Sequence, residues 1–247
     1  KILSMKTMLF NEISVNELKE IIADSIKETL PKIILPKQEK TEAQKERDAV
    51  QLRRLHMLTD VIFGVLLIRL FMLLPHPVKP ETGAFDPLVI FTEGGTNFIM
   101  FVIGFILITI YWIQNNKTSG NLVATDGKHV ALSILQIAFL LLYFYSVRLD
   151  METDSDVLAL FMQSVSLAIA GLAGVAAWIY ASKRGELVSE AVSAEEANEL
   201  KISILAEPLA ATFTIPFAFI GPGLWNLSWL SVIVFGIFLK KRHKKRF

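Results

Sequence analysis

The 247 residues contain no cysteine, which excludes disulfide bonds, thiolate metal sites and cysteine nucleophiles. The four histidines are scattered along the chain, at His56, His76, His129 and His243, and this scatter disfavours a histidine-based zinc site. The formal net charge is only +1, so the chain as a whole has no strong attraction to nucleic acid. P-loop, dinucleotide-binding, nucleophile-elbow and zinc-helix motifs are also missing. We therefore expect no enzymatic activity, no catalytic residue, no resident metal and no cofactor.

Apolar residues are abundant instead. The chain is 53% hydrophobic and 20% charged, with a mean hydropathy of +0.48, which is too apolar for an ordinary soluble domain. An α-helix needs about 20 mostly apolar residues to cross a hydrocarbon core about 30 Å thick. The sequence therefore predicts an all-α polytopic membrane protein with six transmembrane helices. The predicted spans cover about residues 55–74, 97–114, 130–147, 157–180, 202–219 and 224–239.

Local signals add detail to the last three spans. Gly171 and Gly174 give the fourth span a small-residue face, which predicts close helix packing. Ser193 and Glu196 have the spacing of a capping box, so a helix is expected to begin there and lead into the fifth span. Pro208 and Pro216 lie inside the fifth span, which we expect to be bent.

The distribution of Lys and Arg predicts the orientation of the chain. Basic residues cluster on the flanks that share a side with both ends, as in Arg53, Arg54, Lys183, Arg184 and residues 240–246. The opposite flanks are mainly acidic. Because cytoplasmic loops carry an excess of Lys and Arg, we expect both termini to be cytoplasmic in a multi-pass protein of the cell membrane.

Residues 1–50 are more polar and form the first of two predicted domains, the second being the transmembrane domain 51–247. A capping-box spacing at Ser14 and Glu17 opens a predicted cytoplasmic amphipathic helix that ends at Pro31. A linker and a charged helix then lead into the first span. The amphipathic helix could pack on a neighbour or on its own copies, or lie on the membrane. The first reading is favoured because its polar face is acidic as well as basic.

The first span carries polar groups that are costly inside a membrane, namely Arg54, Thr59, Asp60 and Arg69. Arg69, near the outer end, is expected to snorkel or to pair with an acid of the 75–96 loop rather than to select ions. The apolar residues Val65, Ile68 and Met72 are spaced by three and four, which places them on one face of the helix. Rings of such side chains can gate a pore by dewetting, but the same face could simply be bundle core.

Three short motifs stand out: Arg54-x-x-x-Leu58-Thr59-Asp60 in the first span, Trp112-Ile113-Gln114-Asn115 at the end of the second, and Leu135-Gln136 in the third. They resemble the Arg-x-x-x-Phe-Ser-Asp signature, the Trp-x-x-His motif (with an amide in place of the histidine) and the frequent Leu-Asn pair of the transmembrane protein 175 family. The members of this family are potassium channels of endosomes and lysosomes, with six-span bacterial and archaeal relatives. The departures at Leu58 and Asn115 each replace an aromatic ring. The likeness covers about residues 50–245.

The resemblance implies an oligomeric cation channel that conducts potassium, with the potassium ion as its permeant species. It implies a homotetramer whose pore is lined by the first helix of each subunit, and the constricting positions carry over to Val65, Ile68 and Met72. A carbonyl-lined filter is not expected, because the sequence has no Thr-Val-Gly-Tyr-Gly-like segment.

The motif residues are predicted to lock the first helix against the second and third. Arg54 lies six residues before Asp60, which is a poor spacing for a direct pair on one helix. Polar groups on other helices are the better partners for Arg54, Thr59 and Asp60. The expected partners are Trp112, Asn115 and Gln136. We therefore expect Asp60→Asn to weaken assembly more than it changes ion preference.

An alternative function of a different class is a non-conducting membrane anchor or sensor that acts through residues 1–50 on a soluble partner. The expected partners of the channel are other copies of the chain and the lipid bilayer. Potassium flux in liposomes separates the two functions.

Overall fold

The computed structural model describes residues 41–72, 74, 95–153 and 156–244. The chain divides into two units, residues 1–44 and 45–247, and nearly all described residues belong to the second. The amphipathic helix predicted for residues 15–30 lies outside the described residues. The described part of the second unit consists of helices joined by loops, with an isolated bridge between Leu122 and Val188 and no strand. The all-α prediction is confirmed for this part of the chain.

The helices follow the predicted apolar runs but extend beyond them. Helix α3 runs unbroken through residue 50, where a domain boundary was predicted, so the charged lead-in and the first apolar run form one helix. The elements are α3 (Glu42–Phe71), α5 (Gly95–Ser119), α6 (Gly127–Glu152), α7 (Val157–Arg184), α8 (Ala194–Thr214), the 3₁₀ helix η1 (Ile215–Phe219), α9 (Pro222–Ser228) and α10 (Ser231–Lys244).

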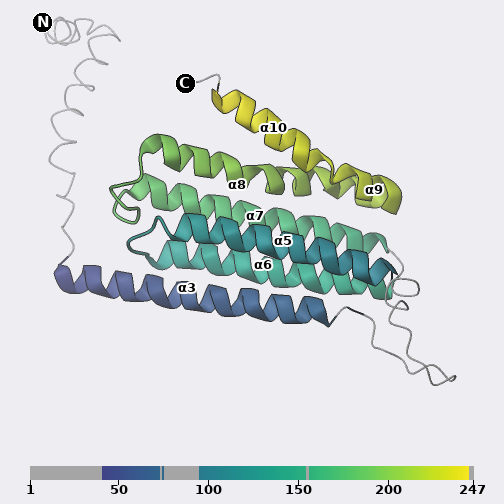
Figure 1. Ribbon diagram of the computed structural model, residues 1–247, viewed down its shortest axis with the longest axis horizontal. Coiled ribbons are helices and arrows are strands. Elements are labelled where there is room, and N and C mark those ends of the chain that lie inside the picture. Colours follow the sequence, from purple (N-terminus) through teal and green to yellow (C-terminus); the bar gives the residue numbers. More distant parts are fainter. Residues whose placement is uncertain (1–40, 73, 75–94, 154–155, 245–247) are drawn as a thin grey trace, which may run out of the picture. The chain divides into compact units, whose positions relative to one another are not determined.

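Helix α7 is the central helix of this unit. It packs against α6 on one side and α8 on the other, and α10 covers the outer side of α8 (Figure 1). The main core joins α7 to α3, α5 and α6 through buried residues such as Leu66, Leu70, Tyr111, Leu140 and Leu167.

The small residues of α7 permit its close contacts. A Cβ atom added at Gly171 would lie 2.7 Å from Pro208 Cβ of α8, and one at Gly174 would lie 2.7 Å from Gln136 Nε2 of α6. No side chain larger than hydrogen fits at either position without movement of a neighbour. The predicted small-residue face is confirmed.

Helix α8 begins with the predicted capping box, in which Ser193 Oγ accepts from the Glu196 N–H and the Glu196 carboxylate accepts from the Ser193 N–H. Pro208 remains inside α8, and the helix changes to the 3₁₀ form just before Pro216. The sixth apolar run, predicted as one helix, is interrupted at Trp229 and Leu230 between α9 and α10.

Buried polar side chains link the irregular segment formed by η1 and α9 to α7. Trp225 Nε1 of α9 donates to Ser164 Oγ of α7 at 2.8 Å, and Ser164 Oγ lies 2.8 Å from Thr214 Oγ1 of α8. Side-chain hydrogen bonds therefore join α7, α8 and α9 a few residues before the break between α9 and α10.

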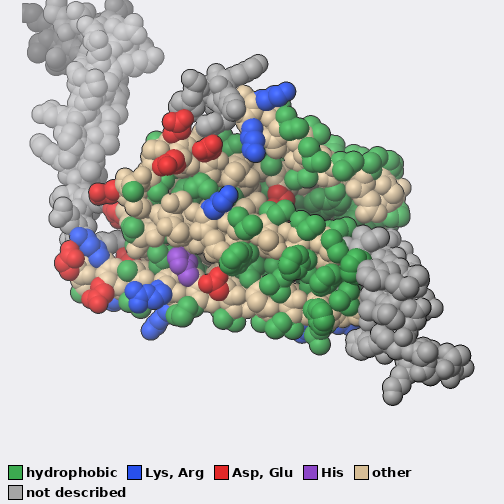
Figure 2. All heavy atoms as spheres, viewed as in Figure 1, with side chains coloured by type: hydrophobic (Ala, Val, Ile, Leu, Met, Phe, Trp, Pro, Cys, Tyr) green, Lys and Arg blue, Asp and Glu red, His purple; other side chains and the backbone are tan. Residues whose placement is uncertain are grey.

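Four helical stretches of the described chain are long and apolar enough to cross a membrane, which supports a membrane protein. They are Gly127–Glu152, Val157–Arg184, Ala194–Phe219 and Pro222–Arg242. Helix α3 is not among them, because Arg54, Asp60 and Arg69 interrupt its apolar residues. Figure 2 shows hydrophobic side chains crowding one half of the visible face, with most charged side chains toward the other end. Six spans stay a prediction.

Candidate functional site

Helix α3 has two distinct faces. Its buried face contains Leu55, Thr59, Phe63, Leu66 and Leu70, at the spacing of three and four residues that keeps side chains on one side of a helix. Phe63, Leu66 and Leu70 pack into the core formed with α5, α6 and α7. This face therefore attaches α3 to the rest of the described unit.

The predicted gate residues lie on the other side of α3. Val65 is 45% exposed, and Ile68 and Met72 are each 64% exposed. Because a helix turns about 100° per residue, this face points away from Thr59, Phe63 and Leu66. An exposed apolar stripe of this kind requires lipid, another chain or a pore axis beside it.

The first family-like motif is divided between the two faces. Thr59 is only 4% exposed, and its hydroxyl donates to the Leu55 carbonyl at 2.8 Å. Arg54 and Asp60 are exposed, and so are Trp112 on α5 and Arg69 near the end of α3. Within one chain, the structure does not bring Arg54, Asp60 and Trp112 together with the other predicted locking residues. Those residues are Thr59, Asn115 and Gln136.

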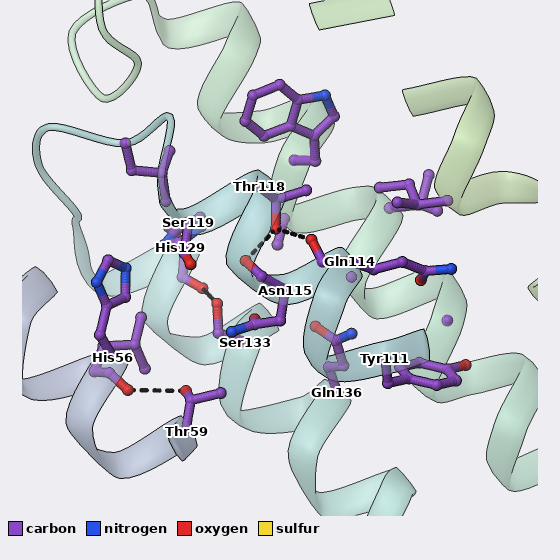
Figure 3. A pocket seen from close by; sticks show the side chains of 18 residues that line it. His56, Thr59, Tyr111, Gln114, Asn115, Thr118, Ser119, His129, Ser133 and Gln136 are labelled. Atoms are coloured by element: carbon purple, nitrogen blue, oxygen red, sulfur yellow. Dashed lines mark hydrogen bonds between the residues drawn. The ribbon is translucent and has the colours of Figure 1, made fainter. Parts of the chain in front are cut away.

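A polar pocket lies between α3, α5, α6 and α7 (Figure 3). Thr59, Asn115 and Gln136, three of the predicted locking residues, line it from three different helices. Its volume of about 40 Å³ is enough for water, since one molecule needs roughly 10–15 Å³ on this measure. The other polar lining residues are His56, Tyr111, Gln114, Thr118, Ser119, His129 and Ser133.

Most hydroxyl groups in this pocket bond to their own helix. Thr118 Oγ1 donates to the carbonyls of Gln114 and Asn115 at 3.1 and 3.0 Å, and Ser133 Oγ donates to the His129 carbonyl at 3.0 Å. His56 Nε2 is shielded from solvent and has no hydrogen-bond partner in the described part of the chain. The pocket therefore offers imidazole and amide groups to water or to a small polar species.

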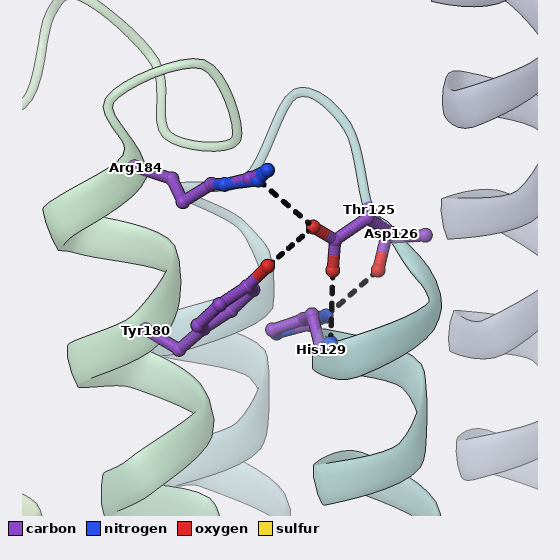
Figure 4. Close-up of polar contacts among 5 residues, drawn as sticks. All are labelled: Thr125, Asp126, His129, Tyr180 and Arg184. Carbon is purple, nitrogen blue, oxygen red and sulfur yellow. Dashed lines mark hydrogen bonds and ion pairs between the residues drawn. The ribbon is translucent and has the colours of Figure 1, made fainter.

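A second polar cluster closes the adjacent end of the bundle (Figure 4). The Tyr180 hydroxyl donates to Asp126 Oδ2 at 2.6 Å, and Arg184 Nη1 lies 3.8 Å from the same oxygen. Asp126 Oδ1 accepts from the His129 N–H at 3.0 Å and so caps α6. Thr125 Oγ1 lies 2.8 Å from His129 Nδ1, which links this cluster to the pocket.

The Asp126 carboxyl has competing influences on its pKa. Partial burial raises the pKa, but the Tyr180 hydroxyl, the His129 N–H and the nearby Arg184 guanidinium stabilise the charged form. The net result is a pKa below the ordinary value for aspartate. Asp126 therefore joins the start of α6 to the end of α7 as a carboxylate.

Sequence reasoning singled out neither Tyr111, His129 nor Glu207. Tyr111 is 1% exposed and lines the pocket, and Glu207 lies on α8 beside it. The sequence does carry a signal for Glu207, because it is an acidic residue inside the fifth apolar run. Ionisable residues in such runs are expensive and are functional candidates by default.

The described residues contain no group of three or more His, Cys, Asp or Glu side chains able to hold a metal ion. No curated protein and no solved structure matches the chain. A family model does match, over residues 54–143, which run from the first motif through the pocket residues of α5 and α6. Its description is endosomal/lysosomal potassium channel TMEM175, so residues 54–143 of the chain are similar to this family.

Proposed function

We propose that the protein is an oligomeric cation channel that conducts potassium. The potassium-channel description of the family model supports this function, and it also argues against an enzyme. The matching segment includes the whole apolar part of α3, so the helix assigned to the pore is part of the likeness.

The exposed apolar face of α3 is the observation that carries the proposal. Val65 and Met72 are seven residues apart, so they span roughly 10 Å along the helix axis. In a tetramer with α3 next to the symmetry axis, Val65, Ile68 and Met72 each form an apolar ring. Such rings exclude water unless the pore widens, which is gating by dewetting.

The same proposal includes six spans with both termini in the cytoplasm. Helix α3 has 30 residues and α5 has 25. Because an α-helix rises about 1.5 Å per residue, each is long enough to cross a hydrocarbon core. Basic residues flank the spans on the side assigned to the cytoplasm. Residues 1–50 belong to that side in this arrangement.

Pore-face substitutions test the assignment. In liposomes loaded with potassium, the wild-type protein is expected to carry potassium flux. Val65→Asn and Ile68→Asn are expected to raise the flux at rest, because a hydrated side chain wets the constriction. Leu67→Asn, next to Ile68 but on another face of α3, is the matched control and is expected to leave the flux unchanged.

Two outcomes contradict the proposal in different ways. Equal flux in all four proteins at equal incorporation places the pore away from this face of α3. No flux in the wild-type protein, together with capture of a soluble partner by residues 1–50, supports the membrane anchor or sensor instead.

A further inference from the structure

Glu207 is an acidic residue of α8 for which the described residues provide no cationic partner. It lies in α8 within the apolar stretch Ala194–Phe219 and immediately precedes Pro208. The residue is partly buried, and its Oε2 atom is shielded from solvent and has no hydrogen-bond partner in the described residues. An oxygen in this position has lost its hydration without replacement.

The groups that face the carboxyl come from α5 and α6. The Tyr111 hydroxyl and the Gln114 amide of α5 interact with it, and Tyr143 of α6 is close enough for an electrostatic interaction. Tyr111 and Tyr143 are the titratable groups among these contacts, and both are buried in the core. None of the described contacts supplies a positive charge.

An ionised carboxylate in this setting is strongly disfavoured. Moving an unpaired charge from water into an apolar interior costs many kcal/mol, and a group so placed neutralises instead. A bound proton removes the charge, whereas neutral tyrosine and glutamine side chains only hydrogen-bond to it. We propose that Glu207 is a proton-binding site and that its side chain is a neutral carboxylic acid in the folded protein at neutral pH.

The polar pocket supplies a path for this proton. Tyr111 and Gln114 line the pocket and also interact with Glu207, so the site lies directly behind the pocket wall. The pocket is large enough for water and is also lined by the imidazoles of His56 and His129, which can accept and release protons. The site is separate from the exposed face of α3, so protonation of Glu207 does not depend on whether that face lines a pore.

The neutral acid also explains how α8 packs so closely. Pro208, the next residue, lies so close to Gly171 of α7 that an added Cβ there would come within 2.7 Å of Pro208 Cβ. A charged neighbour here would draw water between α5, α7 and α8. The proton at Glu207 therefore supports the packing at the centre of the bundle.

Infrared spectroscopy of the purified full chain in lipid tests the proposal. At about pH 7, an exposed glutamate with its ordinary pKa of about 4.3 is ionised and gives no carbonyl-stretch band of a protonated carboxyl. The wild-type protein is expected to show such a band, and glutamate labelled with ¹³C is expected to shift it. Glu207→Gln is expected to remove the shifted component, while Glu199→Gln, at an exposed position of the same helix, retains it.

Two results overturn the proposal. The first is a wild-type spectrum at neutral pH without any protonated carboxyl band that shifts on glutamate labelling. The second is a band that persists in full in Glu207→Gln, which would assign it to another acid. If Glu207→Gln fails to fold, Glu207→Asp serves as the second variant, because it should move the band out of the glutamate-labelled component.

Discussion

At the residue scale, Asp126 shows how one side chain can join two helices. Its carboxylate caps α6 through the His129 N–H and accepts a hydrogen bond from Tyr180 of α7. The ion pair with Arg184 is longer, at 3.8 Å, and partly exposed, so it contributes little on its own. The cap and the tyrosine bond are the main contributions.

Substitutions at Asp126 separate the cap from the charge. Asp126→Ala is expected to lower the free energy of unfolding by about 1 kcal/mol, since it removes the N-cap acceptor. Asp126→Asn retains an acceptor for the cap and is expected to cost less. Chemical denaturation of the protein in detergent measures both, and an equal loss in the two variants would contradict a capping role.

The pH dependence of stability follows from the direction of the Asp126 pKa. Because this pKa is lower in the folded than in the unfolded protein, the stabilisation is present above the unfolded value of about 3.9. It is lost as the pH falls through the folded value. Between neutral pH and acid, the wild-type protein should therefore lose more stability than Asp126→Asn, as measured by thermal unfolding at several pH values.

At the element scale, the contact between α7 and α8 depends on a glycine facing a proline. Pro208 removes a backbone donor from α8, and its ring fits against Gly171, where a Cβ would come within 2.7 Å of Pro208 Cβ. Neither partner is a flexible side-chain tip that can rotate aside. The helices must separate to admit even a methyl group.

Gly171→Ala is accordingly expected to destabilise the protein by about 1–3 kcal/mol, the usual cost of overpacking a core. Gly236→Ala on α10 is the control, because nothing lies within 4 Å of its added Cβ, and it is expected to be neutral or slightly stabilising. Thermal unfolding in detergent compares them. A Gly171→Ala protein as stable as the control would show that α7 and α8 are not in close contact.

The helices could be predicted from the sequence better than their ends or their rotations. Apolar runs and the capping box at Ser193 identified the helices of the described part, because these signals are local. Pro216 predicted an irregularity in the fifth span, and η1 does begin there. The side-chain hydrogen bonds among Ser164, Thr214 and Trp225 join segments that are distant in the sequence, so local patterns do not predict them.

The candidate site was predictable in part, because its motifs are local but the rotation of each helix is not. The resemblance to the family is confirmed over residues 54–143, and the motif pointed to Thr59, Asn115 and Gln136, which do line one pocket. It did not specify how α3 is rotated, so the exposure of Arg54 and Asp60 could not be read from spacing. Their role in locking helices stays a prediction.

At the scale of the whole molecule, the fold of the single chain leaves an apolar face of α3 exposed, as it does on α5 and α10. The core covers one side of α3, while Val65, Ile68 and Met72 remain exposed on the other. The proposed symmetric oligomer around this face would account both for the exposed stripe and for the likeness of residues 54–143 to a potassium-channel family. In that proposal the pore is a property of the assembly rather than of the subunit.

The absence of cysteine from the 247 residues allows a direct test of this pore. Val65→Cys, Ile68→Cys and the control Leu67→Cys each introduce a single thiol, and potassium flux in liposomes is measured before and after a small thiol-reactive cation is added. The account predicts that the reagent blocks flux through Val65→Cys and Ile68→Cys and leaves Leu67→Cys unaffected. Flux that is unchanged in both pore-face variants, at equal incorporation and with labelling verified in unfolded protein, would contradict a pore lined by this face of α3.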